Sequence, residues 1–455
     1  MSRIKTDICV IGAGSGGLSV ASGAAQMGAK VVLIEKGEMG GDCLNYGCVP
    51  SKALLAAGEQ GMDWDAAHAH VKSAIATIAP HDSQERFEGL GCTVIREHAR
   101  FTGPREVQAG DTTVRAKRFV VATGSRPFVP DVPGLDEVPY YTNETIFDLA
   151  EKPDHLLVIG GGPIGLEMAL AHRRLGCEVT VLEGQKPLGK DDPEAAQVVL
   201  DSLAEQGIEV VEQAQAVRIR KTKGRIEVVT EFGRVFTGSH LLVAVGRKAN
   251  VEELGCEAAG VDTTPKGIKV DARLRTSNRR VYGIGDITGG LQFTHVAGYH
   301  GGVVIRPTVL RLPAKARADH LPWCTYTDPE LAQVGLTEAA AREAHGDKLT
   351  VVRADFAGND RAVATGHTKG FIKVMVVGAR PVGVTLVGHN AGELIAPWSL
   401  AVSQKLKLSA ISGMVLPYPT LSEISKRASG NFYTPKLFEN ETLKRLVRIL
   451  QKIVP

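Results

Sequence analysis

Two stretches of the chain follow one pattern, 148 residues apart. The first, "DICVIGAGSGGLSVASGAAQMGAKVVLIE", runs from Asp7 to Glu35, and the second, "HLLVIGGGPIGLEMALAHRRLGCEVTVLE", runs from His155 to Glu183. Each reads as a strand, a glycine turn, a helix, a second strand and an acidic residue. The repeated pattern predicts two Rossmann-like domains built on parallel sheets, and therefore an α/β fold.

The glycine spacing is typical of a dinucleotide-binding turn. The first glycine permits the turn, the second lets the backbone approach a pyrophosphate, and the third lets the helix pack on the strand. The helix N-terminus then faces the phosphates, and the acid accepts hydrogen bonds from a ribose. A glycine-rich loop alone would be weak evidence, but two complete copies predict two bound dinucleotides. The positions are Gly12, Gly14, Gly17 and Glu35 in the first copy and Gly160, Gly162, Gly165 and Glu183 in the second.

The rest of the chain indicates a large enzyme with a third, α+β domain after about residue 320. A formal net charge of +3 over 455 residues gives no support for nucleic-acid binding. We expect no membrane span, because no apolar run reaches about 18 residues. Seven scattered cysteines and a strand pattern close to the N-terminus, with no secretory leader, favour a cytoplasmic, reducing setting. There, a reactive cysteine pair is more often catalytic than structural.

The stretch "GGDCLNYGCVPSK" places Cys43 and Cys48 five positions apart. On a regular helix this spacing gives about 7.5 Å of rise and a turn of about 140°, which fits a disulfide poorly. A bridge would need a local distortion, and Gly47 permits one. A strained, accessible bridge is easily reduced. The pair therefore indicates redox catalysis rather than two unrelated buried cysteines, given the two dinucleotide motifs beside it.

Together these residues resemble the flavoprotein disulfide reductases, the family of dihydrolipoamide dehydrogenase, glutathione reductase and mercuric reductase. "GGDCLNYGCVPSK" resembles the redox-disulfide motif of that family, and "ATG", "GIGD" and "TYTDPELAQVGLTE" match its other motifs in order. The resemblance implies FAD at the first glycine motif and NADH or NADPH at the second. It also implies a homodimer with a shared active site. The implied segments are FAD binding at 1–150, NAD(P) binding at 151–272, further FAD binding at 273–320 and an interface domain at 321–455.

The resemblance also assigns roles to single residues. Cys48 would contact the flavin and Cys43 would attack the acceptor, while Lys52 would lie near flavin N5 and pair with Glu167. From sequence alone, Lys52 and Glu167 could also be ordinary helix-surface charges. No metal ligands are expected. Besides the glycine motifs and their acids, the implied FAD contacts are Lys36, Lys52, Ala99, Thr123, Gly124, Ser125, Asp286 and Ala297, and the implied NAD contacts are Val217 and Gly246.

The sequence departs from the family at "PYPTLSE". Dihydrolipoamide dehydrogenase and glutathione reductase carry a catalytic histidine in H-P-T-x-x-E, whereas this chain has Tyr418 there and keeps Glu423. Mercuric reductases have a similar tyrosine, but they need a C-terminal cysteine pair, and no cysteine follows Cys324 here. Tyr418 could favour reduction of the acceptor, contact a soft metal ion or another substrate, or be a buried aromatic residue.

The sequence therefore predicts an FAD-dependent NAD(P)H oxidoreductase that acts through Cys43 and Cys48 on a small-molecule or protein disulfide. Mercuric, metal-ion or quinone reduction is an alternative, and a catalytically quiet redox-sensing flavoprotein is another. NADH is expected over NADPH, since Glu183 would repel a 2′-phosphate, although Lys186 and Lys190 could offset this.

The last segment, "ENETLKRLVRILQKIVP", has a helical apolar face and a basic polar face. Its apolar face holds Leu443, Leu446, Val447, Leu450 and Ile453. We expect a helix docked on its own domain or on a partner subunit, with a membrane-surface helix as the alternative.

Overall fold

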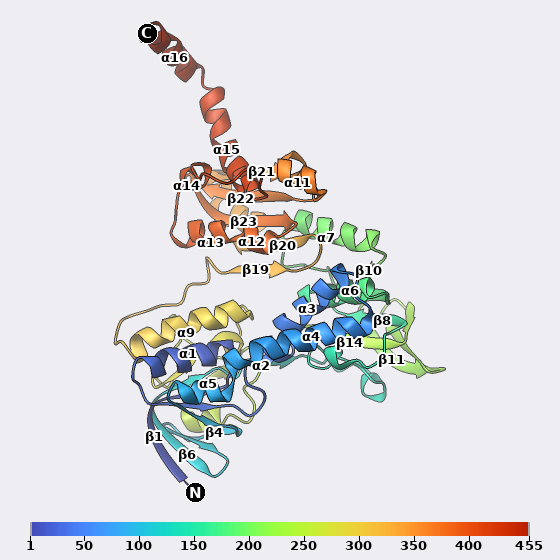
Figure 1. The fold of residues 1–455 in the computed structure, drawn as a ribbon, viewed down its shortest axis with the longest axis vertical. Coiled ribbons are helices and arrows are strands. Elements are labelled where there is room, and N and C mark those ends of the chain that lie inside the picture. Colours follow the sequence, from blue (N-terminus) through green and yellow to red (C-terminus); the bar gives the residue numbers. More distant parts are fainter. Residues whose placement is uncertain (1, 454–455) are drawn as a thin grey trace. The chain divides into compact units, whose positions relative to one another are not determined.

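The computed structural model describes residues 2–453 of the chain (Figure 1). Two compact units make up the chain. One contains the residues up to Gly184 together with Val211–Arg317, and the other contains Gln185–Val210 together with the residues from Ala318 onward. These units cut across the four segments expected from the sequence, whose boundaries stay predictions.

The first unit contains a seven-stranded sheet in the order β3-β2-β1-β6-β5-β4, with β18 also pairing with β6. The pairs that join β1, β2, β3, β6 and β18 are parallel, and β4 and β5 form an antiparallel extension. Because β18 returns to this sheet, the segment expected to complete the FAD-binding domain does pack with its first part. The strands are β1 (Ser2–Ile11), β2 (Val31–Ile34), β3 (Cys92–Ile95), β4 (Ala99–Gly103), β5 (Glu106–Ala109), β6 (Thr112–Val121) and β18 (Val281–Gly283).

Helices α1 (Ser15–Gln26) and α9 (Thr294–Thr308) lie side by side in the first unit (Figure 1). Their contact is close: a Cβ at Gly23 would stand 2.5 Å from Ile305 Cδ1. The pair brings the start of α9 next to the first glycine turn. Other helices of this part are α2 (Gly41–Asn45), α3 (Cys48–Glu59), α4 (Trp64–Ile78), α5 (Gln84–Gly89) and α8 (Cys256–Ala259), with 3-10 turns η1 (Ala79–Asp82), η2 (Leu135–Glu137), η3 (Ile146–Asp148) and η4 (Gly285–Thr288).

The second dinucleotide motif forms a four-stranded sheet in the order β10-β9-β8-β14. Its strands β8 (His155–Ile159) and β9 (Glu178–Leu182) are parallel and are joined through α6 (Pro163–Arg174), as the sequence predicts. The other two strands of this sheet are β10 (Glu209–Val211) and β14 (His240–Val243). A separate three-stranded sheet contains β11 (Ala216–Thr222), β12 (Arg225–Thr230) and β13 (Val235–Gly238). Two further sheets have two strands each: β7 (Ser125–Pro127) with β15 (Arg247–Ala249), and β16 (Thr263–Thr264) with β17 (Gly267–Ile268).

The second unit is the α+β part that the sequence predicts after about residue 320. Its antiparallel sheet has the order β19-β20-β23-β22-β21, and Trp398 is buried in its core. The strands are β19 (Pro322–Thr325), β20 (Glu330–Gly335), β21 (Leu349–Asp355), β22 (Phe371–Val377) and β23 (Arg380–Gly388). The helices are α10 (Glu338–His345), α11 (Asp360–Thr365), α12 (Ala391–Leu394), α13 (Ala396–Ser403), α14 (Leu408–Ser412), α15 (Glu423–Phe438) and α16 (Glu441–Ile453), with η5 (Gly346–Lys348) and η6 (Phe356–Gly358).

Ion pairs and hydrogen bonds connect α7 (Pro193–Glu205) and the residues before it to the rest of the second unit. Asp192 caps α7, and its carboxylate lies 3.0 Å from Lys373 Nζ on β22. Lys373 is buried and also lies 2.9 Å from carboxylate oxygens of Glu194 and Glu338. The indole of Trp323 donates to Asp191 at 2.7 Å. These contacts explain why residues 185–210 pack with the C-terminal part.

The C-terminal helix α16 does not dock on its own domain. None of its residues is buried, and its apolar side chains are exposed except that of Leu443, which is half-buried. Docking on its own domain, one part of the expectation, is therefore wrong, because the apolar face meets no complementary surface within residues 2–453. Docking on a partner subunit and binding to a membrane surface stay predictions. Across the same residues, every helix is too short or too polar to cross a bilayer.

Candidate active site

The first glycine turn has the geometry that a dinucleotide needs. Gly12 has a φ of +103°, and a Cβ there would lie 2.4 Å from the carbonyl oxygen of Ala122. A Cβ at Gly17 would lie 1.9 Å from the carbonyl oxygen of Gly12, so α1 can start this close to β1 only with glycine. The space beside Gly14 is open, at the N-terminus of α1. This turn can accept a pyrophosphate.

The second turn repeats these dimensions. A Cβ at Gly160 would lie 2.4 Å from the carbonyl oxygen of Ala244, and one at Gly165 would lie 1.9 Å from the carbonyl oxygen of Gly160. Beside Gly162 the space is again open. The two motifs therefore share one local structure, although the first strand of the first motif, β1, pairs with β6 and that of the second, β8, pairs with β14.

Each acid that follows a glycine motif lies against its own turn. Glu35 Oε2 accepts a hydrogen bond from the Ala13 N–H at 2.6 Å. Glu183 Oε2 accepts one from the Gly161 N–H at 2.7 Å. These bonds fix each carboxylate at the turn, where a ribose next to the pyrophosphate would lie.

Cys43 and Cys48 lie on two short helices rather than on one regular helix. Cys43 lies within α2, and Cys48 is the first residue of α3. Between them the chain leaves helical geometry at Gly47, with φ −125° and ψ −110°. A Cβ at Gly47 would stand 3.0 Å from the carbonyl oxygen of Asp42. Glycine therefore allows the turn that brings the two thiols together, and both are free thiols in the structure.

The two thiols have opposite electrostatic environments. The pKa of Cys48 is lowered to about 6, chiefly because the Cys43 thiol donates a hydrogen bond to the Cys48 sulfur. Thr294 Oγ1, 3.3 Å from Cys48 Sγ, and the charge of Lys52 act in the same direction. The helix N-terminus also favours a thiolate there. The pKa of Cys43 is raised, first by its hydrogen bond to Cys48 and then by burial. At neutral pH Cys48 is therefore the thiolate and Cys43 the thiol.

Lys52 and Glu167 form an ion pair, with 2.6 Å between Lys52 Nζ and Glu167 Oε2. Glu167 lies on α6 and is only 5% exposed, so it is not an ordinary surface charge. The helices α3 and α6 approach closely at Gly58, where a Cβ would stand 2.8 Å from Arg174 Cβ. This packing holds the lysine one helical turn after Cys48.

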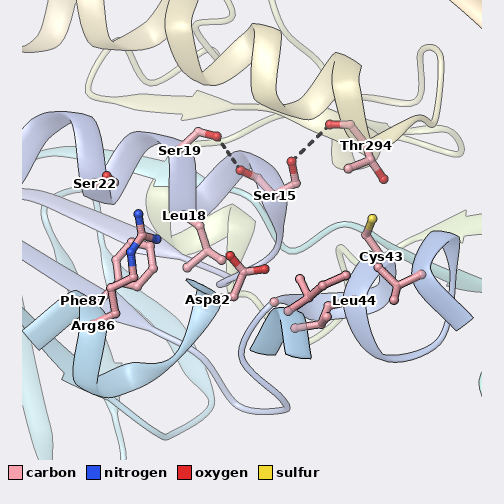
Figure 2. A pocket seen from close by; sticks show the side chains of 13 residues that line it. Ser15, Leu18, Ser19, Ser22, Cys43, Leu44, Asp82, Arg86, Phe87 and Thr294 are labelled. Atoms are coloured by element: carbon pink, nitrogen blue, oxygen red, sulfur yellow. Dashed lines mark hydrogen bonds between the residues drawn. The ribbon is translucent and has the colours of Figure 1, made fainter. Parts of the chain in front are cut away.

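A pocket of about 360 Å³ opens beside Cys43 (Figure 2). One wall is the face of α1, with three serine hydroxyls, and the other walls are mostly apolar. Ser15 donates to the carbonyl of Thr294 at 3.2 Å, which joins α1 to α9 at the pocket. Two charged side chains, Asp82 and Arg86, also line the pocket, and Arg86 lies on the side opposite Cys43 (Figure 2). The lining residues are Ser15, Leu18, Ser19, Ser22, Gly40, Cys43, Leu44, Val49, Ile78, Asp82, Arg86, Phe87 and Thr294.

Comparison with known proteins decides the family. Residues 6–301 match the family described as "Pyridine nucleotide-disulphide oxidoreductase", and residues 321–429 match its dimerisation domain. The chain belongs to the pyridine nucleotide-disulphide oxidoreductases. It is thus an FAD-dependent enzyme that uses a pyridine nucleotide, and the glycine turns described above fit both cofactors.

Relatives of this oxidoreductase carry two different names. A mercuric reductase from Staphylococcus aureus is 34% identical over 452 residues, covering 94% of this chain and 82% of the relative. A dihydrolipoyl dehydrogenase from the same species is 33% identical over 456 residues, covering 94% and 96%. Among solved structures, a Cu(II) complex of the HOCl-induced flavoprotein disulfide reductase RclA from Escherichia coli has a TM-score of 0.88 and 27% identity, covering 94% and 99%. LpdA from Mycobacterium tuberculosis has a TM-score of 0.87 and 26% identity, covering 95% and 100%.

Several expected FAD contacts of the oxidoreductase lie close to the first glycine turn. Thr123 and Gly124 bond to the backbone and side chain of Asn250, which holds the end of β6 against the strand pair β7–β15. Ser125 donates to Asp286 Oδ2 at 2.6 Å, and burial raises the pKa of that carboxyl. Ala297 on α9 lies against Gly16 of α1, with its carbonyl 3.1 Å from where a Cβ would be.

The other residues expected to contact a cofactor differ in how exposed their side chains are. Lys36 is exposed directly after Glu35. Ala99 is buried in the core on β4, where its side chain packs inside the domain. Val217 lies at the β-bulge of β11 with its side chain exposed. Gly246 has a φ of +136° and open space beside it.

An arginine that the sequence analysis did not single out fixes the cysteine helix. The side chain of Arg247 is largely buried, with 11% of it exposed, and its Nη2 lies 3.1 Å from Asp42 Oδ1. Asn143 Nδ2 donates to the same oxygen at 3.1 Å, and Arg247 Nε donates to Ser125 Oγ at 2.7 Å. Thr294 was also missed. No local sequence pattern points to Arg247 or Thr294, because the residues to which each of them hydrogen-bonds at this site are more than 100 positions away in the chain.

Tyr418 and Glu423 lie in the second unit. Tyr418 is 71% exposed, so it is not a buried aromatic residue within the chain. Its hydroxyl donates to Asp360 Oδ2 at 2.8 Å, and this bond raises the pKa of the phenol. Glu423 accepts from the Thr420 N–H at 3.4 Å.

Proposed function

We propose that this oxidoreductase passes electrons from NADH to a disulfide acceptor that binds in the pocket beside Cys43. The observation that supports this most strongly is the asymmetry of the two thiols. Cys48 is poised as the thiolate, and Cys43 is the thiol that lines the pocket. Bound FAD supplies the two-electron link between the nicotinamide and the cysteine pair.

The proposed reaction at the pocket is thiol–disulfide exchange. As Cys43 attacks one sulfur of the acceptor, its proton passes to the departing sulfur, and the S–S bond of the acceptor breaks to release a first thiol. Cys48 then attacks the Cys43 sulfur of this mixed disulfide and releases the second thiolate. The Cys43–Cys48 pair is oxidised by two electrons, and the acceptor is reduced by two. Lys52 and Thr294 keep Cys48 in the thiolate form until this second step.

We propose that the active unit is a homodimer in which a second copy supplies Tyr418 and Glu423 to the pocket. The matched dimerisation domain and the exposure of Tyr418 support this arrangement. The phenol would hydrogen-bond or protonate a departing thiolate. Light scattering of the active enzyme should give the mass of a dimer, and an active monomer would contradict the proposal.

The proposed donor is NADH in a cytoplasmic setting, where the thiol pair can be kept reduced. Glu183 is held at the second glycine turn and would repel a 2′-phosphate. We expect a higher kcat/KM for NADH than for NADPH. Steady-state kinetics with both nucleotides checks this, and the reverse order would contradict it.

An acceptor screen tests the central proposal. Wild type and Cys43→Ser are each reduced with NADH and offered low-molecular-weight disulfides, oxidised protein disulfides and quinones. Disulfide turnover should depend on Cys43, whereas flavin reduction by NADH should persist in the variant. A Cys43→Ser enzyme that still reduces disulfides would refute the proposed exchange. Turnover of quinones alone, equal in both proteins, would favour direct reduction by the flavin.

Reduction of a soft metal ion is the second candidate. Mercuric reductases are among the relatives, and the RclA structure is described as a Cu(II) complex. Tyr418 is also the residue type that the sequence analysis associates with mercuric reductases. Metal-dependent NADH oxidation that exceeds disulfide turnover would favour the second candidate.

A further inference from the structure

The C-terminal helix α16 exposes an apolar face that no other surface covers within residues 2–453. The side chains of Leu446, Val447, Ile449, Leu450 and Ile453 are between 46% and 70% exposed. At 100° per residue they fall on one side of the helix. A face of this kind stays exposed only at a cost in free energy unless another surface covers it.

The opposite face of α16 is basic. It carries Lys444, Arg445, Arg448 and Lys452, and Glu441 is the one acidic residue of the helix. Helical geometry places Lys444 and Arg445 next to the two edges of the apolar face. Lys444 Nζ lies 2.8 Å from Glu441 Oε1 within the helix, whereas Arg445, Arg448 and Lys452 have no acidic residue of α16 to match them. The partner must therefore accept an apolar face and also present negative charge beside it.

A second copy of α16 does not meet these requirements. Two such helices packed through their apolar faces would bring basic residues together at both edges, with a single glutamate per helix to oppose them. The match to the dimerisation domain also ends at residue 429, twelve residues before α16 begins. The helix thus lies outside the part of the chain that matches the dimerisation domain.

We propose that α16 binds the surface of a membrane that contains anionic lipid. The apolar face would enter the boundary between headgroups and acyl chains, and the basic face would remain among the headgroup phosphates. Leu437 and Phe438, both exposed at the end of α15, would add apolar contact at the start of the helix. The enzyme would then work as a peripheral protein whose acceptor is reduced next to a lipid surface.

Vesicle flotation with the complete FAD-containing enzyme tests this proposal. We expect binding to phosphatidylcholine vesicles that contain phosphatidylglycerol, and much weaker binding to phosphatidylcholine alone. Each basic residue near an anionic surface contributes about fivefold in affinity, so Arg445→Gln with Arg448→Gln should weaken binding about 30-fold. Leu446→Ser with Leu450→Ser should weaken it at least about tenfold.

A matched control variant also loses two positive charges, at a site far from α16 in the sequence. Lys221→Gln with Arg225→Gln removes two exposed cations from the β11–β12 hairpin and should leave vesicle binding within about twofold of wild type. NADH-dependent activity without vesicles should be the same in all these proteins, which shows that they are folded. Equal binding to both kinds of vesicle, or no binding, would overturn the proposal. So would a loss of dimer mass in the Leu446→Ser, Leu450→Ser protein without loss of vesicle binding, because the helix would then serve self-association.

Discussion

The hydrogen bond from Cys43 is the largest of the causes that lower the pKa of Cys48, and one substitution can remove it. Cys43→Ala deletes the donor, whereas Cys43→Ser keeps a hydroxyl donor at nearly the same place. The pKa of Cys48 is lowered to about 6, and its hydrogen bond with Cys43 is the largest cause. We therefore expect the pKa to stay near 6 in Cys43→Ser and to rise in Cys43→Ala.

The size of the difference follows from the strength of the bond. A hydrogen bond to a charged group contributes about 1.5–3 kcal/mol, which corresponds to about one or two pKa units. Because Cys48 is partly exposed, we expect about one unit. At pH 7 the thiolate fraction would fall from about 90% in Cys43→Ser to about half in Cys43→Ala.

The assay is a pH titration of Cys48 in both variants with FAD bound. The thiolate–flavin absorbance reports the ionised form, and the rate of alkylation by iodoacetamide gives a second reading. Since the pKa of the folded protein lies below that of a free thiol, the thiolate is present above pH 6 and is lost as the pH falls through that value. Equal pKa values in the two variants would refute the assigned hydrogen bond.

Three further outcomes are expected. Wild type should oxidise dihydrolipoamide poorly, because the Tyr418 phenol is a weak base. Tyr418→His should raise this rate at least about tenfold while Tyr418→Phe does not, in steady-state assays with NAD⁺, and a variant no faster than wild type would count against the reasoning. Glu167→Gln should slow the reduction of bound FAD by NADH at least about tenfold in stopped-flow measurements, since Lys52 loses its buried counterion, and an unchanged rate would mean that the ion pair is structural only. Gly17→Ala should purify without FAD, because its Cβ would collide with the Gly12 carbonyl, and full flavin content by absorbance would contradict this close contact.

Local sequence determined the parts of the fold whose geometry depends on neighbouring residues. The strand, glycine turn, helix and acid of each dinucleotide motif lie within 29 residues, and the structure reproduces both. Gly12 and Gly17 could be predicted because only glycine has no Cβ to meet the adjacent backbone. The cysteine pair could also be recognised from local sequence, because both cysteines lie within one stretch of 13 residues.

The tertiary structure decided which distant residues surround that stretch. Arg247 and Asn143 hold Asp42, and Thr294 reaches Cys48 because α9 packs beside α1. None of these contacts has a spacing that a single sequence could show.

For the C-terminal helix, the sequence predicted the two faces but not their exposure. Its two faces could be predicted from a period of 3.6 residues, but the pattern could not tell whether the apolar face was covered. Only the packing of α15 and its neighbours showed that no residue of α16 is buried. Sequence fixes amphipathicity because it depends on residues a few positions apart. Burial depends on which surfaces the folded chain brings together, so it was decided by the tertiary structure alone.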